Sequence, residues 1–159
     1  MNQRQQKKLT HRLFEAILVG DTARVKAVLR AGADPERADS EGTTPLYEAS
    51  VNGEAEIARL LLAAGASPDT ESSGLGADGT PLCAAACWGH TETVRELLAH
   101  GADPNLREDH GTGWPPLEWA LKGPYPETAD LLTTAGATPR GRTTQHHRSP
   151  SRIPPAQWA

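Results

Sequence analysis

The sequence predicts an all-α solenoid, in which four helix-turn-helix repeats stack in a row with a loop after each repeat. One short block recurs four times along the 159 residues, at 32–35, 65–68, 101–104 and 136–139. Each copy reads Gly-Ala-X-Pro, where X is Asp, Ser, Asp and Thr in turn, and the copies are 33, 36 and 35 residues apart. A spacing of about 20–50 residues is typical of stacked repeats in which each unit contacts only its neighbours.

The first helix of each unit is marked by two columns of apolar residues. With the four blocks in register, the columns are Leu13, Leu46, Leu82 and Leu117, then Ala16, Ala49, Ala85 and Ala120. Residues three apart share one face of a helix, so the columns predict its buried face. Thr44-Pro45 and Thr80-Pro81 precede two of these helices. Threonine can cap a helix there, and proline suits the first helical position.

The second helix follows a glycine that ends the first. Its apolar face is predicted from the pairs Val28-Leu29, Leu61-Leu62 and Leu97-Leu98, and the preceding glycines are Gly20, Gly53 and Gly89. The glycine of each repeated block then falls where helices end in a left-handed residue, a conformation that is costly for any residue with a Cβ. Each unit is therefore helix, turn, helix and loop.

Domain boundaries follow from the same period. We expect a basic N-terminal segment at 1–10, a repeat domain at 11–139 with units at 11–43, 44–79, 80–114 and 115–139, and a disordered basic tail at 140–159. The tail has four arginines, no acid and no apolar period, which is typical of disorder. Residues 72–76 lengthen the second loop, and we expect that inserted stretch to be mobile.

These motifs resemble the ankyrin repeat, whose pattern is T-P-L-H-x-A. Residues 44–49 read TPLYEA and residues 80–85 read TPLCAA, and the resemblance covers about residues 11–139. It implies a curved stack of helix pairs whose loops project as fingers, with a concave face that binds partner proteins. The usual histidine is replaced in all four units, so the hydrogen bond that it makes in the family is expected to be missing. The replacements are Phe14, Tyr47, Cys83 and Glu118.

The resemblance also implies where a partner would bind, because the family varies its finger tips and the last turn of the first helix. The partner-binding residues predicted at those positions are Trp88, Trp114, Glu41, Thr43, Asn52, Asp78 and Thr112. The two tryptophans are the strongest candidates, since large aromatic residues are enriched among interface hot spots. The alternative for Trp114 is that it covers the apolar end of the last unit, and we expect Trp119 in the core.

The loops between units, called fingers below, are acidic. They carry ten acids, Asp34, Glu36, Asp39, Glu41, Asp69, Glu71, Asp78, Asp103, Glu108 and Asp109, and two bases, Arg37 and Arg107. Such a surface attracts a basic protein or peptide and repels phosphate backbones. The alternative is that the acids only make the loops soluble, and Asp34 and Asp103 belong to the turn pattern itself.

The two cysteines support the competing hypotheses only weakly. Cys83, Cys87 and His90 could offer three zinc ligands, but no fourth ligand is suggested. A Cys87-His90 nucleophile pair lacks an orienting group. We therefore predict no catalytic residue, no metal and no cofactor. The alternatives are a cysteine-dependent enzyme or redox-associated protein using Cys83 and Cys87, and a nucleic-acid contact through the basic tail.

The predicted function is a non-enzymatic protein-protein interaction module that binds a basic protein or peptide on its concave, finger-loop face. It would act as a scaffold, inhibitor or regulator, and sequence does not separate these roles. The polar start of the chain, the absence of a long apolar run and the two cysteines four residues apart favour a cytoplasmic monomer without membrane contact.

Overall fold

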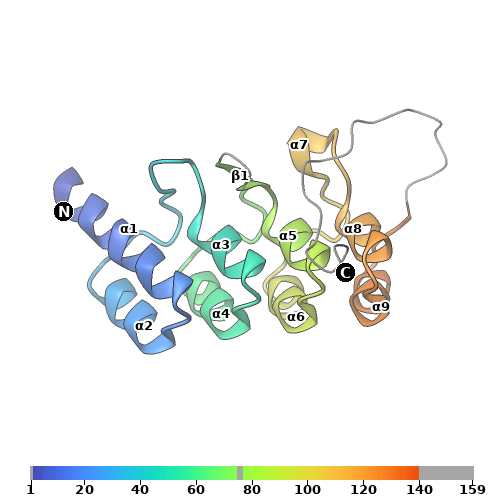
Figure 1. The fold of residues 1–159 in the computed structure, drawn as a ribbon, viewed down its shortest axis with the longest axis horizontal. Helices are drawn as coiled ribbons and strands as arrows, with labels where there is room; N and C mark the ends of the chain where they lie inside the picture. The colour runs from blue at the N-terminus through green and yellow to red at the C-terminus, as the bar shows by residue number, and fades with distance from the viewer. Residues whose placement is uncertain (1, 75–76, 140–159) are drawn as a thin grey trace, which may run out of the picture.

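The computed structural model describes residues 2–74 and 77–139 as a row of four helix pairs (Figure 1). The tail predicted at 140–159 and two residues of the inserted stretch lie outside this part of the chain. One row consists of the inner helices α1 (Gln3–Leu18), α3 (Pro45–Val51), α5 (Pro81–Cys87) and α8 (Pro116–Lys122). The other row consists of the outer helices α2 (Thr22–Arg30), α4 (Ala55–Ala63), α6 (Thr91–Ala99) and α9 (Pro126–Thr134). The predicted solenoid is confirmed.

The inner helices begin as the sequence predicts. The hydroxyl of Thr44 accepts a hydrogen bond from the Tyr47 amide at 3.3 Å, and Thr80 accepts one from the Cys83 amide at 3.2 Å. A proline follows each cap at the start of the helix. Helix α1 is longer, because Asn2 caps it and the helix begins at Gln3. The basic N-terminal segment is thus the first two turns of α1.

Glycines in left-handed conformations end both helices of the first three units and the outer helix of the fourth, whereas Gly123 after α8 has a φ of −83°. The seven predicted helix-ending glycines, at 20, 32, 53, 65, 89, 101 and 136, have φ between +66° and +104°. Two of them are also packed too closely for a side chain. A Cβ on Gly53 would collide with the imidazole of His90, and one on Gly89 would collide with the ring of Tyr125. Each unit therefore places a side chain over the turn of the unit before it.

Both predicted columns of the inner helices are buried, as are Val28, Leu61, Leu97 and Leu132 in the outer row. At the next position along the outer helices, Leu62 is buried, Leu29 and Leu98 are partly buried, and Thr133 is exposed. Thr133 therefore departs from leucine where the column reaches solvent. Its hydroxyl donates to the Ala129 carbonyl at 2.8 Å.

A ladder of hydrogen bonds joins the repeated blocks to one another. The residue after each proline accepts a hydrogen bond from a backbone amide of the next block. Asp69 accepts from the Asp103 amide at 3.0 Å, Asn105 from the Thr138 amide at 2.9 Å, and Glu36 from the Ser67 amide. In the first unit, the side-chain oxygen of Gln6 in α1 accepts a hydrogen bond from the Asp34 amide at 3.3 Å. The repeated block thus ties each unit to its neighbour.

The fingers project from the inner row on the side away from the outer helices (Figure 1). The first spans residues 34–43, the second 67–79 and the third 103–115. The second finger contains a two-stranded antiparallel hairpin, β1 (Ser72–Gly74) and β2 (Ala77–Gly79), with Ser72 opposite Gly79. Strand β1 is the first part of the stretch that was expected to be mobile. The third finger carries the short helix α7 (Glu108–Gly111).

Candidate functional site

The surface formed by the inner helices and the fingers is the one predicted to be concave, and it keeps that name below. Tryptophans fill its C-terminal end. Trp119 of α8 is buried, as expected, and its Nε1 donates to Oε1 of Glu108 in the third finger at 2.7 Å. The Trp114 and Trp119 rings lie 4.9 Å apart at an angle of 49°. The Lys122 ammonium lies 4.7 Å from the centre of the Trp114 ring, a favourable cation-π contact. These contacts hold the third finger against α8.

Two further contacts close the third finger. The Arg107 guanidinium donates to the Gly113 and Thr112 carbonyls at 2.9 and 3.1 Å. The Cys83 thiol of α5 lies 3.5 Å from the Trp114 carbonyl, within hydrogen-bond distance for sulfur. The thiol is a weak donor, so Cys83, at the position of the family's histidine, makes this contact with the loop.

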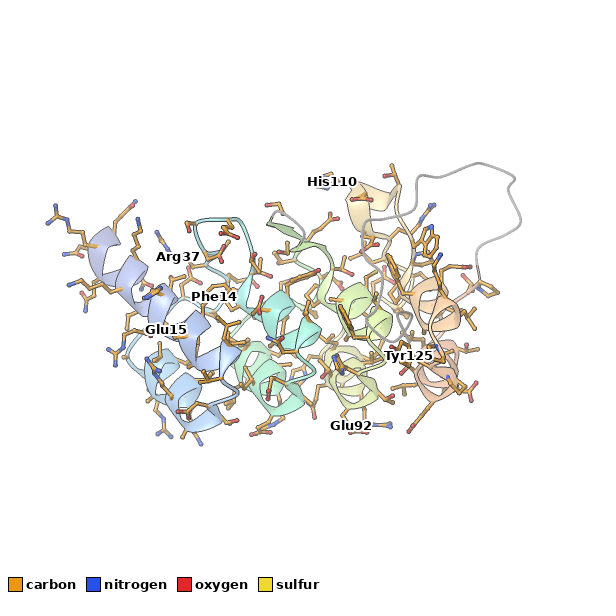
Figure 2. The ribbon with its side chains drawn as sticks, in the orientation of Figure 1. Phe14, Glu15, Arg37, Glu92, His110 and Tyr125 are labelled. Atoms are coloured by element: carbon orange, nitrogen blue, oxygen red, sulfur yellow. The ribbon has the colours of Figure 1, made fainter. Side chains whose placement is uncertain are left out.

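The second and third fingers are joined by Glu71. Its carboxylate accepts hydrogen bonds from the amides of Asp109 and His110 at 2.6 and 3.4 Å, and lies 3.1 Å from the His110 imidazole. Both residues have a φ of 52°, a left-handed conformation that is unusual outside glycine. Glu71 thus stabilises a strained turn in its neighbour. Figure 2 shows His110 at the outer end of the third finger, away from the two rows of helices.

The first finger is held mainly by its own carboxylate. Oδ1 of Asp39 accepts hydrogen bonds from the Glu41 and Thr43 amides at 2.9 and 3.0 Å. The Gly42 carbonyl accepts one from the Ser73 amide of the second finger at 3.1 Å. Asp39 makes a local turn. The first finger contacts the second through the backbone, through the Ser72 hydroxyl and through the Glu36 carboxylate, which accepts from the Thr70 hydroxyl at 3.0 Å.

Most acids of the fingers therefore have structural partners. Of the ten acids, Glu108 is only 4% exposed, so its carboxylate cannot contact a partner directly. Six others accept backbone or side-chain hydrogen bonds: Asp34, Glu36, Asp39, Asp69, Glu71 and Asp103. Within residues 2–74 and 77–139, the side chains of Glu41 and Asp109 are exposed and make no hydrogen bond. The Asp78 side chain lies outside what is described.

The predicted partner-binding residues do not gather in one place. Glu41 is at the tip of the first finger, and Thr43 beside it is only 5% exposed, which withholds its side chain from a partner. Thr112 and Trp114 belong to the third finger. Trp88 and Asn52 follow the C-terminal ends of α5 and α3, which is the end away from the fingers.

These residues also differ in what they offer a partner. Trp114 and Trp88 are half-buried against the core. Asn52 is exposed and donates to Glu48 at 3.0 Å, and the exposed Thr112 donates to the Asp109 carbonyl at 2.8 Å.

A groove of about 590 Å³ lies at the other end of the concave surface, between α1 and the first finger. Its apolar side chains include Phe14 and Leu18 of α1, and Arg37 lines it from the finger. Figure 2 shows Arg37 and Phe14 beside one another at this gap, with Glu15 lower on α1. None of the residues predicted for partner binding lines it. The exposed Leu18, in an apolar position at the end of α1, was the available signal.

The cysteines offer no accessible chemistry. Cys83 and Cys87 are 0% and 1% exposed, and both are thiols. Among residues 2–74 and 77–139, no three His, Cys, Asp or Glu side chains are grouped so that they could hold a metal ion. Across the same residues, no helix has the length and apolar character needed to cross a membrane.

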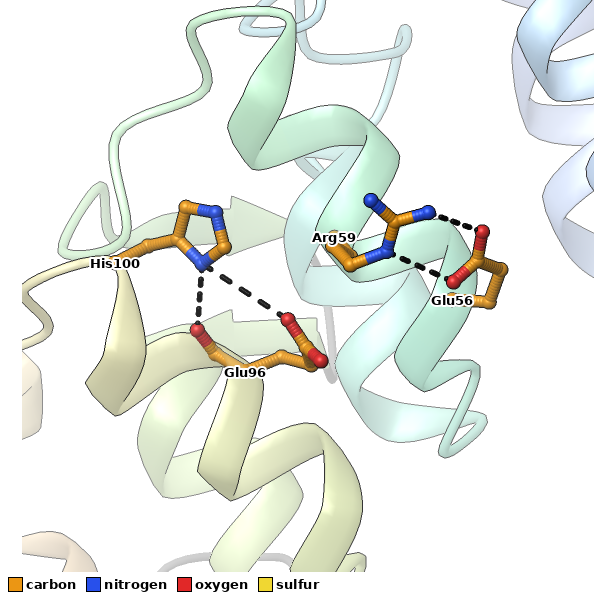
Figure 3. A network of polar contacts seen from close by, with 4 residues as sticks. All are labelled: Glu56, Arg59, Glu96 and His100. Carbon is orange, nitrogen blue, oxygen red and sulfur yellow. Dashed lines mark hydrogen bonds and ion pairs between the residues drawn. The ribbon is translucent and has the colours of Figure 1, made fainter.

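The outer helices present a solvated polar surface. Arg59 of α4 donates to Glu56 from Nε at 2.9 Å, and its hydrogen bonds lower the pKa of Glu56 (Figure 3). On α6, Nδ1 of His100 lies 2.9 Å from the Glu96 carbonyl and 4.0 Å from its carboxylate. Exposed pairs of this kind contribute little binding energy or stability. The functional surface is therefore sought on the concave side.

Comparison with protein families gives one match. A family model described as ankyrin repeats (three copies) matches residues 2–72 and 71–142. No curated protein sequence matches the chain. The family match covers all four helix pairs and the three fingers.

Proposed function

We propose that the concave surface of this chain, which belongs to the ankyrin repeat family, binds a basic protein or peptide. Repeats of this family generally act as protein-protein interaction modules. The single observation that supports a basic partner is the charge of the stack: residues 31–139 hold eighteen acids and five lysines or arginines. A field of this size attracts a basic partner and speeds its association.

Hydrogen bonding does not remove this charge. A backbone amide is neutral, so a hydrogen bond from it cancels none of a carboxylate's negative charge. The acids that join the units and fingers therefore still contribute to the field, although their positions are restricted. Glu41 and Asp109 add two exposed carboxylates at the first and third fingers.

The mode of action that we propose is rigid presentation. Adjacent fingers are tied by Gly42 to Ser73 and by Glu71 to Asp109 and His110. Binding to surfaces held in this way needs little backbone rearrangement. A module of this kind can occlude a partner, as an inhibitor or regulator, or hold it near another protein, as a scaffold.

A charge-neutralisation experiment tests the basic-partner proposal. The probe is a fluorescent ten-residue peptide of alternating arginine and glycine, titrated against the full chain at rising salt concentrations. The test variant combines Glu41→Gln with Asp109→Asn, since asparagine tolerates the left-handed conformation. We expect weaker binding with a smaller salt dependence.

The matched control carries Glu127→Gln and Asp130→Asn, two exposed acids of the outer helix α9. It removes the same charge away from the fingers and is expected to bind as the unmodified chain does. Equal loss in both variants would show that only net charge matters. Binding that neither variant alters would contradict the finger surface.

A further inference from the structure

The groove between α1 and the first finger has an apolar floor. Phe14 and Leu18 lie four residues apart on α1, on one face of the helix, and both line the groove. Leu18 is 63% exposed, one of three large hydrophobic residues exposed to this degree in the part of the chain that the structure describes. An apolar side chain of a partner would remove this surface from water.

The acceptors in the groove already have donors. Glu15 forms an ion pair with Arg24 of α2 at 2.8 Å and lies 3.4 Å from the His11 imidazole. The other two acids that line the groove are Asp39 and Glu48. Asp39 accepts from two backbone amides, and Glu48 accepts from the side-chain amide of Asn52.

By contrast, three donors that line the groove have no acceptor among the described residues. The side chains of Lys7 and Arg37 line it from α1 and from the first finger, and neither forms an ion pair or a side-chain hydrogen bond within residues 2–74 and 77–139. Thr10 also lines the groove and is 5% exposed, and its hydroxyl has no hydrogen-bond partner among the described residues. The groove thus offers three donors, Lys7, Arg37 and Thr10, that no acceptor among the described residues takes up.

The surrounding charge also changes sign here. Helices α1 and α2, residues 3–30, carry seven lysines or arginines and two acids, whereas the rest of the stack is strongly acidic. Helices α1 and α2 are therefore the basic part of the described chain, while the lining of the groove itself combines Lys7 and Arg37 with the carboxylates of Glu15, Asp39 and Glu48. An anionic group approaching this end meets a local attraction that the second and third fingers do not offer.

We propose that this groove binds a carboxylate of the partner protein together with an adjacent aliphatic side chain. The carboxylate accepts charge-assisted hydrogen bonds from Arg37 and Lys7, and the aliphatic group packs on Phe14 and Leu18. This inference rests on the proposed function, in which the concave surface receives a protein. It adds an orientation, since the partner's acidic and apolar element lies at α1 and its basic segment lies over the second and third fingers.

The test uses small probes and the isotope-labelled full chain. N-acetyl-leucine supplies a carboxylate and an aliphatic side chain, N-acetyl-leucinamide lacks the charge, and leucinamide reverses it. We expect N-acetyl-leucine to shift amide resonances of α1 and the first finger in a saturable way, and the other two compounds to bind more weakly. Arg37→Gln and Lys7→Gln should each raise its dissociation constant about fivefold or more, as expected for the loss of one charge-assisted hydrogen bond.

The matched control is Arg95→Gln, which removes an exposed positive charge from the outer helix α6 and should leave binding of N-acetyl-leucine unchanged. The spectra themselves report whether each variant is folded. Absence of a saturable shift, an equal response to leucinamide, or unchanged binding in Arg37→Gln would overturn the proposal. Inorganic phosphate that binds as tightly as N-acetyl-leucine would also overturn it, because phosphate makes no use of the apolar floor.

The two proposals fail separately. If the arginine-glycine peptide still binds and responds to the finger variant while N-acetyl-leucine does not bind, only the carboxylate site is lost. If the peptide fails and N-acetyl-leucine binds, the basic-partner proposal is lost.

Discussion

The first and third fingers use equivalent positions in opposite ways. Asp39 and Glu108 both stand seven residues after the glycine of their repeated block, and Glu48 and Trp119 are equivalent on the following inner helices. At the third finger, Glu108 accepts from the Trp119 indole, and the finger packs on α8. At the first finger the same two positions hold two carboxylates, which cannot donate to one another. Asp39 accepts from its own finger instead, and a groove remains beside α3.

This difference shows how one kind of repeat forms a closed finger at one end of the stack and a groove at the other. A donor facing an acceptor closes the space between finger and helix. The two carboxylates in the same places, Asp39 and Glu48, line a groove instead. The overall fold is unaffected, because the buried columns of the inner helices are the same in both units.

The largest effect is expected for Trp119→Ala, which removes the centre of the closed end. Loss of a buried tryptophan should lower the free energy of unfolding by about 3–5 kcal/mol. Urea denaturation followed by circular dichroism measures it. Trp88→Ala is the control, because Trp88 is half-buried and should cost less. Equal losses would mean that the third finger is not held by Trp119.

The second prediction compares the two equivalent carboxylates directly. Glu108→Ala leaves the buried Trp119 indole without this acceptor and should cost about 1–3 kcal/mol. Asp39→Ala releases two amides near solvent and should cost about 0.5–1.5 kcal/mol. The same urea titration ranks them. A larger loss for Asp39→Ala would reverse the comparison on which the open groove rests.

The third prediction transfers the closed arrangement to the first finger. The double variant Asp39→Glu with Glu48→Trp places an acceptor and a donor at the two positions. In a double-mutant cycle, the coupling between the changes should be stabilising by about 0.5–1.5 kcal/mol. The same variant should no longer bind N-acetyl-leucine. A coupling near zero would show that the backbone of the first finger, and not these side chains, keeps the groove open.

The smallest effect is expected on the outer surface, for Glu56→Gln. The hydrogen bonds from Arg59 lower the pKa of Glu56 below its ordinary value of 4.5. Any stabilisation from this pair is therefore present above pH 4.5 and is lost as the pH falls through the lowered pKa. Because the pair is exposed, thermal unfolding at pH 7 should not change measurably. A clear drop in melting temperature would show that the outer surface contributes more than either finger comparison assumes.

The sequence alone predicted the stack and many of its details. The repeated block located the helix ends, the leucine and alanine columns located the core, and Thr44 and Thr80 are the caps expected. Trp119 is in the core as predicted. The ten acids were visible too, but not that Glu108 is buried or that Glu36 and Asp69 join neighbouring units.

The groove was not predicted, because its walls come from residues far apart in the sequence. Lys7 and Phe14 line the groove from α1, and Arg37 lines it from the first finger, which follows α2. Of the predicted contacts, Trp88 follows the C-terminal end of α5, whereas Trp114 precedes the N-terminal end of α8. A list of exposed residues does not show which of them face one another.

The sequence by itself determined what is local and periodic: four helix pairs, their capped starts, their glycine ends and the buried columns. These features depend on residues within one or two turns of each other, so spacing alone carries them. Only the tertiary structure decided which finger closes on its neighbour and which leaves a groove. Those contacts join residues 11 to 39 positions apart, such as Glu108 with Trp119 and Glu71 with His110. The geometry of the folded stack brings such partners together, and no local pattern records it.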